Sequence, residues 1–116
     1  MDRNDIYKKI EFNQENIKKI NSDLDQLKGE RVQDKELVQH FERIMFDLKN
    51  NCSTKEINAL YKKNKILISE ELEMIEKDYQ NQRELLEDSL KVLGKENDLL
   101  NNELFNERRE NEKNNE

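Results

Sequence analysis

The chain has 116 residues, of which 41% are charged and 33% are hydrophobic, and its net charge at pH 7 is −6. This apolar content is too low for a compact globule, in which buried surface must offset the loss of conformational entropy. Two classes remain: a long-helix protein with narrow apolar stripes, and a disordered chain. The acidic balance disfavours non-specific binding to nucleic acid.

No segment reaches the roughly 20 apolar residues that a membrane-spanning helix needs, and the N-terminus has no apolar signal-peptide core. We therefore expect no membrane insertion and a cytoplasmic location, with export by a signal-peptide-independent route as the alternative. A single cysteine, Cys52, and a single histidine, His40, offer neither an intrachain disulfide nor a clear metal site. Without a glycine-rich phosphate loop or a nucleophile–base pair, the sequence predicts no cofactor, no metal and no enzymatic activity.

A seven-residue apolar repeat runs through the first half of the chain. Eleven of its fourteen core positions are apolar, and the frame never slips. A period of 3.5 sustained this long is typical of a helix with a left-handed supercoil rather than of disorder. The repeat predicts a first helix over about residues 4–50. The core positions are Ile10, Ile17, Leu24, Arg31, Val38, Met45 and Cys52 at a, and Ile6, Asn13, Ile20, Leu27, Asp34, Phe41 and Leu48 at d.

This first helix has one weak zone. Arg31 and Asp34 occupy consecutive core positions just after Gly29, and glycine costs about 1 kcal/mol in a helix interior relative to alanine. We expect a local bend or a hydrated layer around residues 29–35. Beyond that zone the apolar stripe widens, because Leu37 and Ile44 join it from flanking positions.

A break follows at residues 49–56. Asparagines end the first helix, and Ser53 with Glu56 fits a capping box at the start of the next helix. Cys52 and Ile57 flank this box at the spacing of a hydrophobic staple. We predict a turn at residues 51–53 and antiparallel helices, because short connections join antiparallel neighbours. The alternative is one unbroken rod.

The second predicted helix, about residues 54–106, carries an apolar stripe with a spacing close to 3.6, which indicates a nearly straight helix. Other apolar residues, including Leu60, Leu67, Met74, Leu85 and Leu99, widen this face beyond what one partner helix needs. Residues 107–116 contain no apolar side chain and are predicted to be a disordered polar tail. The domain is thus one helical hairpin over residues 1–106, all-α and coiled-coil-like, which we expect to join a larger helical bundle with a partner.

A fold at residue 51 or 52 pairs residue i with about 103 − i, so that the apolar end of the second helix lies at or past the end of the first helix. Such residues need a cover from another protein or from a second copy. We therefore predict that the second helix supplies the partner-binding surface. The residues of this predicted surface are Ile68, Leu72, Ile75, Tyr79, Leu86, Leu90, Leu93, Leu99, Leu100, Leu104 and Phe105.

In layout, residues 4–105 resemble the small helical-hairpin proteins encoded beside LXG toxins of the Gram-positive type VII secretion system, distant relatives of the WXG-type secreted proteins. The shared features are the length, the two long helices, the segment from Phe41 to Leu48 and the turn from Asn50 to Ser53. The chain departs from the WXG pattern in having no Trp-x-Gly at the turn. The resemblance implies a chaperone or targeting factor that binds the helical domain of an LXG toxin for export.

Two functions follow as expectations. The first is a non-enzymatic adaptor that pairs its helices with the helical domain of a secreted LXG-type toxin. The second is a self-associating structural coiled-coil scaffold. Neither involves nucleic acid, and the two are distinguished by whether a second copy or a different helical protein covers the apolar surface.

Overall fold

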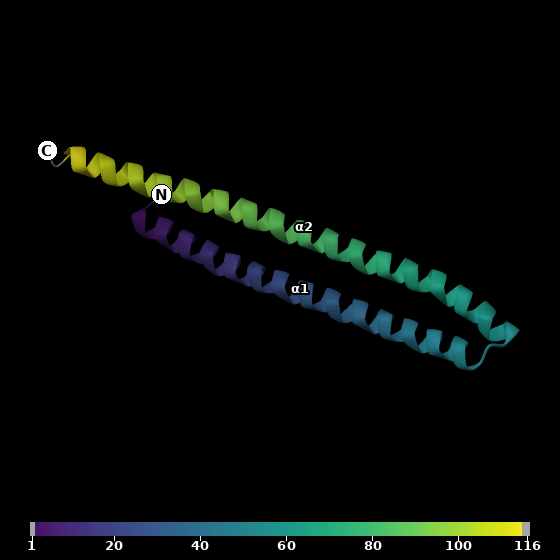
Figure 1. Cartoon of the computed structure of the whole chain (residues 1–116). Helices are drawn as coiled ribbons and strands as arrows, with labels where there is room; N and C mark the ends of the chain where they lie inside the picture. Colours follow the sequence, from purple (N-terminus) through teal and green to yellow (C-terminus); the bar gives the residue numbers. More distant parts are fainter. Residues whose placement is uncertain (1, 115–116) are drawn as a thin grey trace. The chain divides into compact units, whose positions relative to one another are not determined.

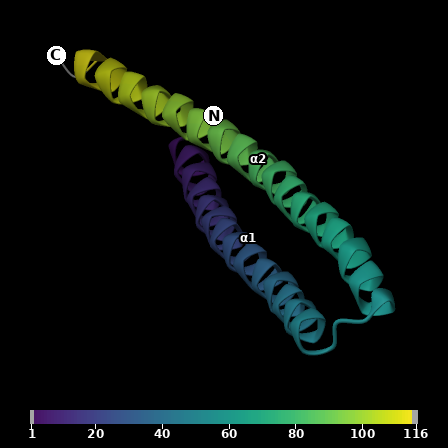
Figure 2. The same ribbon diagram turned by 45° about the vertical axis from the view of Figure 1, so that its right-hand side comes forward.

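The computed structural model describes residues 2–114, which form two α-helices, α1 (Arg3–Asn51) and α2 (Lys55–Asn114), and no strand. Residues 52–54 connect the end of α1 to the start of α2 (Figures 1 and 2). The predicted all-α hairpin is confirmed, and the alternative of one unbroken rod is wrong. Neither helix, as far as it is described, has a stretch apolar and long enough to traverse a lipid bilayer.

The residue before each helix accepts a hydrogen bond from the first turn of that helix. The carbonyl of Asp2 accepts the first backbone hydrogen bond of α1, from Ile6 at 3.0 Å. At α2 the backbone N–H of Ile57 donates to Thr54 Oγ1 at 3.2 Å, so Thr54 is the N-cap and the capping box predicted at Ser53 is wrong. Serine and threonine are both favourable N-cap residues, with serine slightly preferred. Here a backbone bond from Thr54 to the Cys52 carbonyl places the helix start one residue later, and Cys52 is exposed instead of forming the predicted staple.

The second helix extends eight residues beyond its predicted end, so residues 107–114 are helical instead of forming the expected tail. This segment has no proline or glycine and is rich in glutamate, arginine and lysine, which are good helix formers. It also extends a helix that already exists, which costs no new nucleation. Residues 115 and 116 of the predicted tail lie outside the described residues.

The chain divides into two compact units, each a pair of antiparallel helical segments. We call the unit that contains residues up to Leu24 and from Glu84 onward the terminal unit. The other, Asp25–Arg83, contains the connection and is called the turn unit. In each unit α1 and α2 contact along one surface, the seam.

The seam of the terminal unit holds an apolar cluster of Ile6, Ile10, Leu100 and Leu104, all buried. Next to it, Asn13 Nδ2 donates to Asn97 Oδ1 at 2.9 Å, and both asparagines are buried. A buried amide that lacks a partner is costly, so this bond lets the seam contain polar groups. It also fixes which residue of α1 lies opposite which residue of α2.

The predicted register is wrong by about seven residues. Asn13 meets Asn97 in the terminal unit, and Arg31 lies against Tyr79 in the turn unit, so paired residue numbers add to 110 instead of 103. Part of the difference comes from the connection, which is centred on residue 53. Part comes from the lean of helical side chains toward their own N-terminus, which adds about two residues in an antiparallel pair. As a result Leu100 and Leu104 are covered by α1, not left beyond its end.

Candidate protein-binding surface

An exposed apolar stripe runs along α1 in the turn unit. Leu37, Phe41, Ile44 and Leu48 follow one another at intervals of four, three and four residues, which places them on one side of the helix. All four are exposed. The residues that face the seam are their neighbours, such as half-buried Val38 and buried Met45. The stripe is therefore a second apolar lane beside the one that packs within the hairpin.

A matching stripe runs along α2. Leu60, Leu67 and Met74 are spaced by seven residues and are exposed, whereas Ile68 beside them is buried in the seam. The two stripes lie on the same side of the turn unit, because Leu37, Phe41 and Leu67 line one groove of about 430 Å³. Val38, Asn64, Ile68 and Glu71 form the rest of this groove.

We call this surface the apolar face. It consists of Leu37, Phe41, Ile44, Leu48, Leu60, Leu67 and Met74. Five of its members were predicted to lie beside the main apolar stripes. These are Leu37 and Ile44 on the first helix and Leu60, Leu67 and Met74 on the second.

The opposite side of the turn unit is mixed in character. A groove there is lined by Gln39, Glu42, Arg43, Phe46 and Tyr61. The Lys49 ammonium lies 4.5 Å from the centre of the Tyr61 ring, within the range of a cation–π contact. The turn unit is thus apolar on one side and mixed on the other, where Phe46 is exposed among polar neighbours.

A charged layer crosses the seam at the end of the turn unit far from the connection. Arg31 Nη1 lies 3.4 Å from Glu76 Oε1, Lys35 Nζ lies 2.7 Å from Glu76 Oε2, and the Arg31 guanidinium lies 4.0 Å from the centre of the Tyr79 ring. Hydrogen bonds from Lys35 and then Gln80 hold the pKa of the Glu76 carboxyl below its ordinary value. The polar layer predicted at residues 29–35 is present, although Asp34 is exposed and α1 is continuous through Gly29.

The predicted partner-binding residues do not form one exposed surface. Ile68, Leu100 and Leu104 are buried, so their assignment to an outward-facing site is wrong. Six others are only half-exposed, namely Leu72, Ile75, Tyr79, Leu86, Leu90 and Leu93. Leu99 and Phe105 are exposed, but they belong to the terminal unit. The physical reason is the register, which gives the main stripe of α2 a cover within the hairpin.

In the terminal unit, polar contacts accompany the seam at the chain ends. Arg108 Nη2 donates to Tyr7 Oη at 3.1 Å, and Lys9 Nζ lies 3.5 Å from Glu96 Oε1. Hydrogen bonds from Arg3 and then Arg108 lower the pKa of the Tyr7 hydroxyl. The Arg108–Tyr7 and Lys9–Glu96 contacts join the two helical segments, so they contribute to the pairing at this end of the unit.

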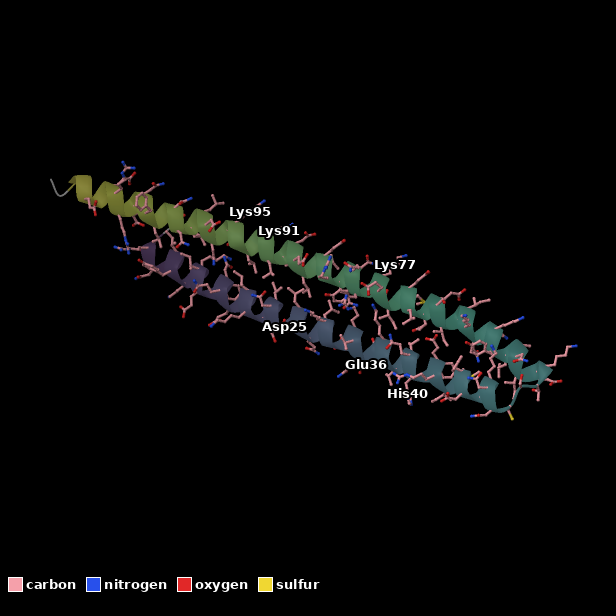
Figure 3. All side chains as sticks on the ribbon, viewed as in Figure 1. Asp25, Glu36, His40, Lys77, Lys91 and Lys95 are labelled. Atoms are coloured by element: carbon pink, nitrogen blue, oxygen red, sulfur yellow. The ribbon has the colours of Figure 1, made fainter. Side chains whose placement is uncertain are left out.

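Within residues 2–114 no group of three or more His, Cys, Asp and Glu side chains is placed to hold a metal ion. His40 lies on the side of α1 away from α2 (Figure 3), and Cys52 is exposed in the connection. The apolar face is therefore the best candidate for a functional surface. Comparison with protein-family models, curated proteins and solved structures finds no match for the chain.

Proposed function

We propose that the protein is a non-enzymatic helical adaptor that packs the apolar face of its turn unit on helices of a partner protein. The observation that carries this proposal is the face itself, with seven large apolar side chains exposed on one side of two adjacent helices. Contiguous apolar patches on soluble proteins mark interaction sites. Two helices that each present a second apolar lane have the geometry of one half of a four-helix bundle.

The resemblance to hairpin proteins encoded beside LXG toxins supports a particular partner. We propose the helical domain of a secreted LXG-type toxin, which the hairpin stabilises or targets for export. The complex then forms in the cytoplasm and leaves it by a route that needs no signal peptide. Heptad-like stripes on the hairpin fit an amphipathic helix of the partner laid along the groove at Leu37, Phe41 and Leu67.

Co-expression with an LXG-type helical domain encoded by a neighbouring gene tests the proposal. The wild-type chain should co-purify with that domain. F41D/L67D should abolish the complex, because each aspartate places an unpaired charge at the centre of the contact. I66D is the matched control, since Ile66 is 63% exposed and Leu67 is 51% exposed but only Leu67 belongs to the apolar face. Capture that is insensitive to F41D/L67D, or equally sensitive to I66D, would contradict the proposed surface.

A further inference from the structure

The apolar face has two-fold symmetry in its sequence spacing. On α2, Leu60 and Met74 lie seven residues to either side of Leu67. On α1, Leu37 and Leu48 lie symmetrically about a point between Phe41 and Ile44. Since paired residue numbers of α1 and α2 add to about 110, that point lies at the level of Leu67. Both stripes therefore share one centre.

The charged residues that border the apolar face on α2 are also arranged about Leu67. Acidic and basic residues alternate, so that reversal of the helix brings opposite charges together. Glu56, Lys63, Glu70 and Lys77 follow at intervals of seven residues along the outer edge of the Leu60–Leu67–Met74 stripe, and all four are exposed. Figure 3 shows Lys77 on the side of α2 away from α1. Reversing the direction of α2 about Leu67 pairs residue i with 134 − i, so Lys63 comes to the level of Glu71, next to Glu70, and Glu56 comes within one residue of Lys77.

Three of these charges have no partner of opposite sign within their own helix. Ion pairs along a helix form between residues three or four apart. Around Lys63 these positions hold Ala59, Leu60, Ile66 and Leu67. Around Glu56 and Glu70, too, no lysine or arginine stands at these spacings. The row of charges is thus arranged for a second chain.

From these observations we infer that the apolar face binds a second copy of the chain in an antiparallel, two-fold symmetric four-helix bundle, with α1 on α1 and α2 on α2. Leu67 packs against Leu67 of the second copy, Leu60 against its Met74, and Phe41 against its Ile44. Lys63 then lies at the level of Glu71 of the second copy and beside its Glu70, and Glu56 lies within one residue of its Lys77. The two-fold axis passes through the Leu67–Leu67 contact, which occurs once, and it duplicates each of the other contacts.

The size of the face suits a stable dimer. Large apolar side chains exposed to this degree each present on the order of 100 Å², so the seven together present on the order of 700 Å², close to the about 800 Å² per partner of a standard interface. A different two-fold arrangement, with α1 against α2 of the second copy, would put Lys63 opposite Asp47 and Glu70 opposite His40. It forms fewer lysine–carboxylate pairs, so the charges favour α2 against α2.

Complementary charge variants test this arrangement. K63E/K77E makes the row on α2 entirely acidic, and E56K/E70K/E71K makes it entirely basic. Wild type should sediment at twice the 14.1 kDa monomer mass at tens of micromolar. Each variant alone should dimerise on the order of 30-fold more weakly, because four attractive contacts become repulsive. A 1:1 mixture should restore a dimer that contains one chain of each kind.

K62E/K65E is the matched control, because it makes the same change in net charge on another side of α2 and should dimerise like wild type. Circular dichroism checks that every variant remains helical. A wild-type chain that is monomeric up to about 100 μM would overturn the inference, as would a basic variant that self-associates as tightly as wild type. The latter result would indicate that α1 faces α2 of the second copy.

The inference rests on the apolar face of the proposed function, but the two can fail separately. A monomeric wild-type chain that still captures the helical domain through Phe41 and Leu67 refutes only the homodimer. A dimer with the predicted charge dependence that never binds such a domain refutes only the adaptor role. If both hold, the partner must displace the second copy, and the charge variants should bind the partner at lower concentrations than wild type does.

Discussion

The two units of the hairpin use similar apolar content in different ways. The terminal unit places its best apolar side chains in the seam, where Ile6, Ile10, Leu100 and Leu104 are buried together. The turn unit buries only Met45 and Ile68 to the same degree and carries ten of the sixteen large apolar side chains that are exposed. A seam that is filled needs no further cover, whereas a seam flanked by exposed apolar lanes provides a surface for another protein.

The polar groups of the two seams also differ, because those of the terminal unit are buried and those of the turn unit are hydrated. In the terminal unit, Asn13 and Asn97 are buried and satisfy each other with one neutral hydrogen bond. In the turn unit, Arg31, Lys35 and Glu76 form a charged layer that remains partly accessible to water. A buried amide pair specifies register because any slip leaves an unpaired group, while a hydrated ion pair tolerates small adjustments. The terminal unit is therefore the more specific of the two pairings.

The largest expected effect is loss of the apolar cluster in the terminal unit. Leu100→Ala should destabilise the chain by about 2–4 kcal/mol, because it removes buried methyl groups and leaves a cavity. Leu99→Ala is the matched control, since Leu99 is 69% exposed and Leu100 is 7% exposed. Urea unfolding followed by circular dichroism measures the difference. Equal effects of the two substitutions would show that the terminal seam is no better packed than its surroundings.

A smaller effect should come from the asparagine pair. Asn97→Ala should cost about 1–3 kcal/mol, because it leaves the buried Asn13 amide without its partner. N13L/N97L should recover most of that stability, since both polar groups are then replaced together. Amide hydrogen exchange shows where along the chain the stability is lost. Exchange should be faster near Asn13 and unchanged near Met45. A uniform change along the chain would contradict the view that the units are stabilised separately.

The smallest effect should come from the charged layer of the turn unit. The folded-state pKa of Glu76 is lowered by Lys35 and Gln80, so its contribution is present above the ordinary carboxyl pKa of about 4.3 and is lost as the pH falls through the folded-state pKa. Glu76→Gln should therefore flatten the fall in stability below about pH 5. Glu73→Gln, at an exposed position of the same helix, is the control. If the free energy of unfolding depends on pH identically in wild type and Glu76→Gln, the charged layer does not contribute to stability.

The helices could be predicted from the sequence because periodicity records which residues share a face. Ile6, Ile10 and Met45 occupy predicted core positions and are buried, whereas Phe41 and Leu48, at predicted core positions as well, are exposed. The start of α2 was missed by one residue, because Ser53 and Thr54 are both good caps and only the backbone of the connection decides between them. Polarity alone predicts disorder after residue 106, whereas the residues there are good helix formers and continue α2.

The candidate site was harder to predict than the fold. Periodicity shows that Leu60, Leu67, Ile68 and Leu72 are apolar positions of α2, but it does not show which of them α1 covers. That depends on the register, which differs by about seven residues from the predicted one, in part because of side-chain direction and the position of the connection. The signal that could have located the face was the pair of flanking lanes, Leu37 with Ile44 and Leu60 with Leu67, which are surplus to one seam.

The exposed Cys52 in the connection is a natural labelling site from which a distance within the dimer can be measured. As the single cysteine of the chain, it accepts one spin label per copy without any substitution. Pairing about Leu67 sends the two connections to opposite ends of the bundle, each roughly 20 Å from the centre at 1.5 Å per helical residue, so the labels should lie about 40 Å apart. The arrangement with α1 against α2 would bring them side by side, so one distance distribution distinguishes the two bundles.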